Sequence, residues 1–380
     1  MQTGKMLVNK GDVQPGTSRN REVVLLLAVH YFPPAKMLPG AASVCPSLHG
    51  ELTGLLMLSR HRFSKEIKEQ IKTLYLYDNH HAPLALLQNL FWISLAIYLG
   101  ESSPWLLPLA ILLIGSRQRA LATLLHEAAH GALCRSKRLE RFLGTWCSGY
   151  FIFQSWVSYK RSHTLDHHHK LGDPERDPDY RYYRQSGVFE DRSPFRFALT
   201  HLIKPILFLN APGSLKYLLI NRLIRCPSKG ELLSVLVCQC LIALCLTMTI
   251  GVKGYFLYWL LPYLTTFQAL TWFIELSEHY PMIAEAKTDL QATRNRFSHP
   301  VEHFFTAMHG ENFHLIHHLF PAIPYWNLKK AHRILLTDPE YASVNAGFGG
   351  IFVSSNFAPS LWAGILSGDK SATGVVINAS

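Results

Sequence analysis

The segment His126-Glu127-Ala128-Ala129-His130 is the first of three histidine clusters that decide how this chain folds. The other two are His163-Thr164-Leu165-Asp166-His167-His168-His169 and His314-Leu315-Ile316-His317-His318. Imidazole is a common neutral ligand for iron, zinc and copper. One tetrahedral metal needs only three or four protein ligands, whereas these clusters offer at least seven histidines. The sequence therefore predicts a protein that holds two histidine-ligated metals.

The spacing inside each cluster suits a helix. His126 and His130 are i and i+4, so on a helix their side chains share one face about a turn apart. In the second cluster the candidate ligands are His163, His167 and His168, and in the third they are His314, His317 and His318. His169 is left out, because adjacent histidines rarely all face one centre.

Four apolar runs flank the clusters and predict helices that cross a membrane. They cover residues 83–99, 104–125, 232–250 and 255–274, and two short links join them into two hairpins. Most are about as long as a bilayer is thick. The second run is the weakest, because Arg117 and Arg119 are costly in hydrocarbon. We read it as a helix that leaves the membrane near Gly115 and carries His126 just outside.

Composition and charge support a membrane protein. Hydrophobic residues make up 48% of the chain, charged residues only 17%, and the net charge is +11. A basic balance fits nucleic acid or an anionic membrane surface, but no nucleic-acid motif is present, so no nucleic-acid partner is expected. Basic residues are frequent in 131–230 and sparse in the two hairpin links. The positive-inside rule therefore places all three clusters on the cytoplasmic side.

Two other chemistries use parts of these motifs. His-Glu-x-x-His is the signature of zinc metalloproteases, with Glu127 as general base, but one zinc would leave two clusters unexplained. Glu127-x-x-His130 and Glu311-x-x-His314 fit the spacing of soluble di-iron carboxylate bundles. Those bundles do not need histidine pairs, so the surplus of histidines favours a histidine-rich site.

Residues outside the clusters complete the predicted site. His279 follows the last apolar run and could become a further ligand. Four polar neighbours of the ligands are candidates to accept hydrogen bonds from the imidazoles and fix their tautomers: Glu127, Asp166, Glu278 and Asn312. The loop 173–179, with its Asp-Pro-Asp end, either closes over the site or is a solvated turn.

These motifs resemble the membrane fatty acid desaturase and hydroxylase superfamily over roughly residues 80–335. The family's three histidine boxes are present in order, and Glu278-His279 resembles the extra histidine that many members place after their last spanning helix. The flanks of the last box also match: Asn312-Phe313, Leu319-Phe320-Pro321, Pro324 and His332.

The resemblance implies an all-α integral membrane fold. Four transmembrane helices in two hairpins would carry a cytoplasmic helical cap that holds the di-metal site. It implies two non-haem irons, dioxygen, and electrons from a ferredoxin or small haem protein with its reductase. The implied ligands are His126, His130, His163, His167, His168, His279, His314, His317 and His318.

The implied reaction is desaturation of a fatty acyl lipid or other apolar chain that enters from the membrane. Hydroxylation or carotenoid-type ketolation starts from the same hydrogen abstraction and remains open. Glu127 and the Asp-Pro-Asp sequence also resemble carotenoid ketolases and small-molecule desaturases of the superfamily.

Three regions are expected along the chain. Residues 1–56 form a disordered or spurious N-terminal segment, with the hypothesis that translation starts at Met57. Residues 57–340 form the desaturase domain, and residues 341–380 form a C-terminal tail.

Overall fold

The computed structural model describes residues 58–225, 228–355 and 358–368. The predictions for residues 1–56 and for a start at Met57 lie outside the described residues. Within them the secondary structure is helical, apart from one isolated bridge between Ser59 and Thr288. The prediction of an all-α fold is therefore confirmed for the part of the chain that the structure describes.

Two long helices have the length and composition needed to cross a membrane: α2 (His81–Ser102) and α10 (Lys229–Ile250). On α2 the buried residues Ala82, Ala85, Asn89, Ile93 and Ala96 form one stripe, as expected of a helix that packs on one side. Most of the apolar surface of both helices faces outward, and Leu87 and Phe91 on α2 are about as exposed as Leu241 and Leu244 on α10. Exposed apolar area of this extent is typical of a surface that meets lipid or another protein.

The four-span prediction is met only in part, since no other helix in the described residues passes the same test. The second apolar run begins with a short 3₁₀ turn at 104–106 and continues in α3 (Leu107–His130), where Arg117, Gln118 and Arg119 interrupt it. The fourth run is divided into α11 (Lys253–Tyr255), η6 (Phe256–Leu260), α12 (Leu261–Leu264) and α13 (Thr266–His279). Pro262 contributes to this division because it has no N–H to donate within a continuous helix.

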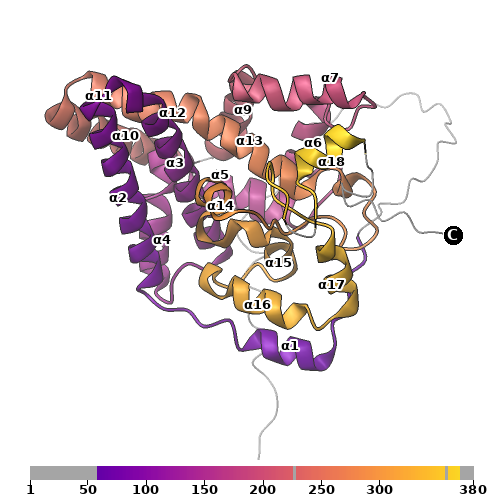
Figure 1. Ribbon diagram of the computed structural model, residues 1–380. Helices are drawn as coiled ribbons and strands as arrows, with labels where there is room; N and C mark the ends of the chain where they lie inside the picture. Colours follow the sequence, from indigo (N-terminus) through magenta and orange to yellow (C-terminus); the bar gives the residue numbers. More distant parts are fainter. Residues whose placement is uncertain (1–57, 226–227, 356–357, 369–380) are drawn as a thin grey trace, which may run out of the picture. The chain divides into compact units, whose positions relative to one another are not determined.

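Helix α3 is the central element, and it packs against α2, α4 (Lys137–Thr145) and α13 (Figure 1). The two helices approach closely at Gly115, where a Cβ would lie 2.1 Å from Thr266 Oγ1 and 2.8 Å from Phe267 N. Thr266 Oγ1 donates a hydrogen bond to the carbonyl of Ile111 over 2.8 Å. Small residues allow helix backbones to approach in this way. This crossing fixes α3 and α13 relative to each other. It therefore also fixes the histidines that both helices carry at their C-terminal ends.

The other helical elements of the described residues are shorter than α2, α3 and α10. They are α1 (Lys65–Lys72), η1 (Pro104–Leu106), η2 (Gly149–Ile152), α5 (Trp156–Tyr159), η3 (Lys160–His167), α6 (Pro178–Gln185), α7 (Pro194–Ala198), η4 (Leu199–Ile203), α8 (Lys204–Ile206), α9 (Ala211–Leu218), η5 (Leu219–Ile224), η7 (Met282–Ala284), α14 (Pro300–Thr306), η8 (Met308–Phe313), α15 (His314–Leu319), η9 (Tyr325–Asn327), α16 (Leu328–Leu335), α17 (Pro339–Ala346) and α18 (Leu361–Ser367).

Candidate metal centre

The nine histidines singled out in the sequence lie together in two neighbouring groups. In the first group every ligand nitrogen lies within 4.8 Å of the others, and its members are His126, His130, His163, His168 and His317. The second group contains His167, His279 and His318 at the same separation. His314 joins it, because its Nε2 lies 3.0 Å from Nε2 of His279 and 3.0 Å from Nε2 of His318.

Local backbone structure explains how each cluster presents its rings. Helix α3 ends directly after His130, because Gly131 takes the left-handed conformation (φ 74°) that closes a helix. The second cluster lies on the π-helix η3, where the amide of His168 donates to the carbonyl of His163 over 3.0 Å. A π-helical turn closes at i+5 rather than i+4. This turn brings His163, His167 and His168, at i, i+4 and i+5, to one side of the helix.

The third cluster follows a sharp turn in the chain. His309 (φ 53°) and Gly310 (φ 71°) are left-handed inside η8, and α15 then starts at His314. His314, His317 and His318 lie at i, i+3 and i+4 on this short helix, and His314 and His318 are near His279 at the end of α13. The ligands thus come from α3, η3, α13 and α15 and from the residue that follows η3.

The spacing of the nitrogens fits metal ions. Nε2 of His168 lies 3.1 Å from Nε2 of both His163 and His317, and the two contacts of His314 are 3.0 Å. Two nitrogens bound at right angles to one metal, at about 2.1 Å each, lie about 3.0 Å apart. His130 Nε2 is buried, and no described residue forms a hydrogen bond with it. The residues of both groups therefore fit a bound metal.

In three of the histidines a carboxylate contacts Nδ1, the ring nitrogen opposite the one that faces the other ligands. Nδ1 of His126 lies 3.1 Å from Glu127 Oε1, Nδ1 of His167 lies 3.0 Å from Asp177 Oδ1, and Nδ1 of His314 lies 3.4 Å from Glu278 Oε2. Such partners fix the ring so that Nε2 faces the metal. Glu127 and Glu278 lie where the sequence placed them.

Two predicted partners lie elsewhere. Asp166 is half-buried, and within the described residues no hydrogen bond joins it to a histidine. On the π-helical turn it is at i+3 from His163, off the side that the ligands share. Asn312 instead holds Arg296, because its Nδ2 donates to the Arg296 carbonyl over 3.1 Å. Arg296 in turn contacts Glu278 at 3.0 Å, so Asn312 reaches His314 only indirectly.

The loop after the second cluster is part of the site rather than a solvated turn. Asp177 and Asp179 are both buried, and Asp179 forms an ion pair with Arg222 at 3.1 Å. The sequence left both interpretations open because an Asp-Pro-Asp loop looks the same in either setting. His169, by contrast, is exposed, and its Nδ1 lies 2.7 Å from the carbonyl of Thr164.

Burial sets the protonation of most of the cluster. It lowers the pKa of His163, His168 and His317 well below the usual value of 6.5. These imidazoles are neutral at pH 7, which is the form that binds a metal. Burial also acts to lower the pKa of His167, but the carboxylates of Asp177 and Asp179 outweigh it and raise that pKa to about 9.

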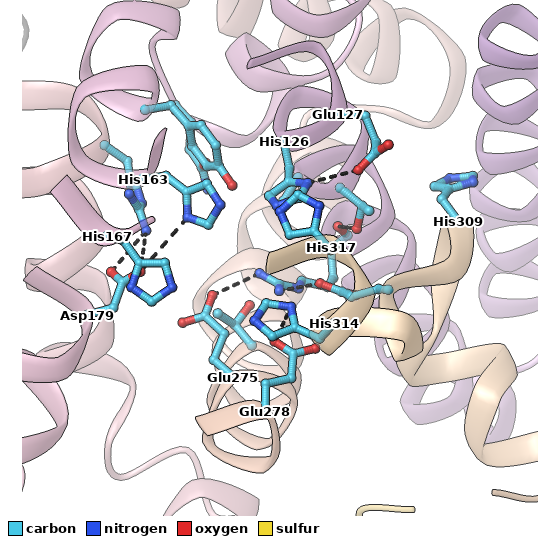
Figure 2. Close-up of a pocket in the computed structure, with 18 of the residues that line it drawn as sticks. His126, Glu127, His163, His167, Asp179, Glu275, Glu278, His309, His314 and His317 are labelled. Atoms are coloured by element: carbon cyan, nitrogen blue, oxygen red, sulfur yellow. Dashed lines mark hydrogen bonds and ion pairs between the residues drawn. The ribbon is translucent and has the colours of Figure 1, made fainter. Parts of the chain in front are cut away.

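A cavity of about 60 Å³ adjoins the histidines. Figure 2 shows His126, His163, His314 and His317 around it, with Glu275 and Glu278 on one side. Arg119 also lines the cavity and pairs with Glu275 at 3.1 Å and with Glu311. The sequence treated Arg119 only as an obstacle to membrane insertion. Its position seven residues before His126, on the same helix face, was the available signal for a role in the site.

Comparisons with known proteins agree with this geometry. The sequence profile of a family described as "Fatty acid desaturase" matches residues 102–347. The chain is also 37% identical over 302 residues to the dihydrorhizobitoxine desaturase of Bradyrhizobium elkanii. That alignment covers 77% of this chain and 85% of the relative.

Proposed function

The chain belongs to the fatty acid desaturase family, and from this premise we propose that it is a dioxygen-dependent desaturase with two non-haem irons. Family membership makes it an oxidoreductase related to membrane-associated enzymes. The observation that supports two irons is the arrangement of nine histidines in two groups, each with the nitrogen spacing of a single metal site.

The proposed reaction converts two adjacent saturated carbons into a C=C bond. Each carbon loses one hydrogen, and dioxygen takes up these two hydrogens together with two electrons and two protons to give two waters. The electrons come from a one-electron donor, which we propose is a ferredoxin or a small haem protein with its reductase. Bound iron supplies an oxidising strength that no side chain has.

The chain's own residues position and shield this chemistry. Glu127, Asp177 and Glu278 orient three of the ligand rings through their Nδ1 atoms. Most of the ligands are buried, and exclusion of water protects a reactive site from side reactions. As part of the proposal, the enzyme is a multi-pass membrane protein with its metal centre on the cytoplasmic side.

Two alternative activities are less well supported. Hydroxylation or carotenoid-type ketolation would use the same ligands, and the desaturase name of the relative favours loss of two hydrogens. A zinc metalloprotease would use His126, Glu127 and His130 alone. Glu127 instead contacts His126 Nδ1, and three further histidines share the same group.

Metal analysis together with product mass tests the proposal. The purified chain is expected to contain two irons. Extracts from cells that express it are expected to contain a product two hydrogens lighter than its precursor. One zinc and no iron would overturn the proposal in favour of the protease, and a gain of one oxygen would replace desaturation by hydroxylation.

The comparisons leave the substrate open. The family description names fatty acids, whereas the relative's name refers to dihydrorhizobitoxine. An acyl lipid is the candidate that the apolar surfaces of α2 and α10 favour.

A further inference from the structure

A groove on the surface lies apart from the cavity beside the histidines. It runs between α6 on one side and α9 and η5 on the other, and its volume is about 460 Å³. Two stacked tyrosines line it, Tyr182 and Tyr217, with ring centroids 4.5 Å apart. The Tyr182 hydroxyl lies 3.0 Å from Ser214 Oγ, and the Tyr217 hydroxyl donates to Asp179. These contacts fix the position of the two rings in the groove wall.

Three cations line this groove, and no described carboxylate does. They are Arg181 on α6, Lys216 on α9 and Arg225 directly after η5. Arg181 and Arg225 donate to neutral groups, a backbone carbonyl and an amide oxygen. Within the part of the chain that the structure describes, none of the three forms an ion pair, whereas Asp179 is already paired with Arg222 at 3.1 Å. A concave surface lined by one sign of charge attracts the opposite sign, so an anionic group is the expected ligand.

Apolar side chains lie beside the cations. The two tyrosine rings and Ile220 contribute apolar atoms to the groove itself. Ile224, four residues after Ile220, is 63% exposed. Removing apolar atoms from water is favourable, and a free phosphate ion would cover none of them. A ligand that fits both features is amphiphilic, with an anionic head and apolar chains.

The segment before α9 exposes further apolar side chains. Residues 194–209 form α7, η4, α8 and the turn after them. The exposed large side chains of this segment include Phe195, Leu199, Ile203, Ile206 and Leu209. Its other side is buried, where His201 packs against Phe197 and Trp272. The segment leads directly into α9, one wall of the groove. An exposed apolar face beside a group of cations is typical of a helix that lies in the interface of a membrane.

Resting on the membrane location in the proposed function, we propose that this groove binds the head group of an anionic membrane phospholipid. The phosphate lies among the three cations, and the acyl chains lie along Ile220, Ile224 and the exposed side of residues 194–209. The cytoplasmic leaflet carries anionic lipids, and basic pockets at this level bind their head groups. In the described chain no ligand histidine lines the groove, so this lipid holds the enzyme at the membrane and needs no metal to bind.

Three probes separate the charge of the head group from the phosphate itself. Dihexanoyl phosphatidylglycerol and dihexanoyl phosphatidylcholine share the phosphate and the acyl chains, but only the first has a net negative charge. Glycerol 3-phosphate keeps the phosphate without acyl chains. Calorimetry on the full chain in a neutral detergent is expected to show phosphatidylglycerol binding about tenfold more tightly than either of the others. Equal binding of the two lipids would overturn the inference, and equally tight binding of glycerol 3-phosphate would assign the groove to a soluble phosphate instead.

Two triple variants locate the binding. The first removes the groove cations and is expected to abolish the preference for phosphatidylglycerol: Arg181→Gln, Lys216→Gln and Arg225→Gln. The second makes the same change of charge on exposed side chains of α16 and is expected to keep the preference: Lys329→Gln, Lys330→Gln and Arg333→Gln. Equal losses in the two variants would mean that net charge alone attracts the lipid, which contradicts a site in the groove. If the first variant does not fold, Lys216→Gln alone decides, because that side chain is exposed and unchanged binding would overturn the inference.

A fluorescent label tests whether the groove faces the bilayer. The label is placed in a cysteine-free chain that is reconstituted into phospholipid vesicles. A label on Ile224→Cys is expected to be quenched by phospholipids with brominated acyl chains, whereas a label on Lys330→Cys is not. An unquenched label at residue 224 would overturn the inference.

Lipid binding and metal content can fail separately. A chain without iron that keeps its preference for phosphatidylglycerol overturns the proposed di-iron chemistry and leaves the lipid site standing. A chain with two irons and no such preference overturns the lipid site alone.

Discussion

At the scale of single residues, Asp177 shows how one carboxylate controls a ligand. Its Oδ1 faces Nδ1 of His167 and also accepts the amides of Asp179 and Tyr180 at the start of α6. Asp177→Asn retains the helix cap but no longer offers a charged acceptor to His167. We expect iron affinity to fall about 10–100-fold, measured by competition with a chelator. Asp166→Asn is the control, and an equal loss in both variants would contradict the assignment.

The histidines themselves give a second prediction at this scale. His167→Ala and His314→Ala are expected to abolish activity, because each removes a nitrogen from the second group. His169→Ala and His299→Ala are expected to be tolerated, since His169 is exposed and the His299 side chain accepts a hydrogen bond from the amide of Val301, away from the metal-ligand groups. Product formation, normalised to the amount of folded protein, is the measurement. An inactive His169→Ala with normal expression would mean that the second cluster is wrongly assigned.

His201 lies away from the metal centre and predicts a pH effect. Burial lowers the pKa of His201 to about 4, and its ring stacks on Trp272. Between pH 6.5 and about 4 the unfolded chain binds a proton that the folded chain does not. The contribution of His201 to stability is therefore present above pH 6.5, falls as the pH drops through this window, and levels off below it.

The replacement His201→Phe removes this titration. The variant is expected to lose less thermal stability than the parent chain between pH 7 and pH 5. Differential scanning fluorimetry of the two proteins at both pH values measures the difference. Parallel losses in the two proteins would show that folding does not lower the pKa of His201.

Single residues also show how far sequence reasoning reaches. The nine histidines could be found because metal ligands repeat at short local spacings. The sequence could not decide whether Asp166 or Asp177 is the hydrogen-bond partner of a ligand histidine. The answer depends on a π-helical turn that no sequence pattern predicts. Arg119, Glu275 and Glu311 come from α3, α13 and η8, and only the packing of these three elements brings them together.

At the scale of elements, the crossing of α3 and α13 gives a prediction about packing. A Cβ at Gly115 would lie 2.1 Å from Thr266 Oγ1, so Gly115→Ala must separate the helices or shift Thr266. We expect a loss of about 1–3 kcal/mol in the free energy of unfolding and lower iron content, because His279 moves with α13. Gly347→Ala is the control, since a Cβ there meets nothing within 4 Å. A normal melting temperature for Gly115→Ala would show that the crossing adapts.

The hairpin links give a prediction about topology. Ser102 and Gly254 lie in or next to the two near-neutral links and are expected to face away from the cytoplasm. Cysteines placed there in a cysteine-free chain should react with a membrane-impermeant reagent only from the non-cytoplasmic side. Labelling of both links from the cytoplasm would overturn the four-span prediction.

Two of the four predicted spans, α2 and α10, are long continuous apolar helices, and there is a physical reason why only these could be predicted. Composition marks where apolar residues gather, so α2 and α10 could be found from the sequence. It does not report backbone continuity, and the run 255–274 therefore looked like one helix although its backbone is divided around Pro262 and Thr265.

At the scale of the whole molecule, the all-helical character of the described residues and the desaturase family were predictable, because both follow from motifs and composition spread along the chain. The boundaries at 56 and 340 remain predictions. The cavity beside the histidines could not be predicted, because its lining residues come from distant parts of the sequence.

The distribution of the ligands along the chain also constrains how the protein is made. His126 and His318 are separated by 192 residues. At about 5–20 residues per second, a ribosome needs roughly 10–40 s to add the last ligand after the first. During that interval the nascent chain carries the first two clusters without the histidines that complete either group. Under the proposed function, neither of the two irons can be fully enclosed before synthesis has passed residue 318, so the metal centre is completed only late in the synthesis of the chain.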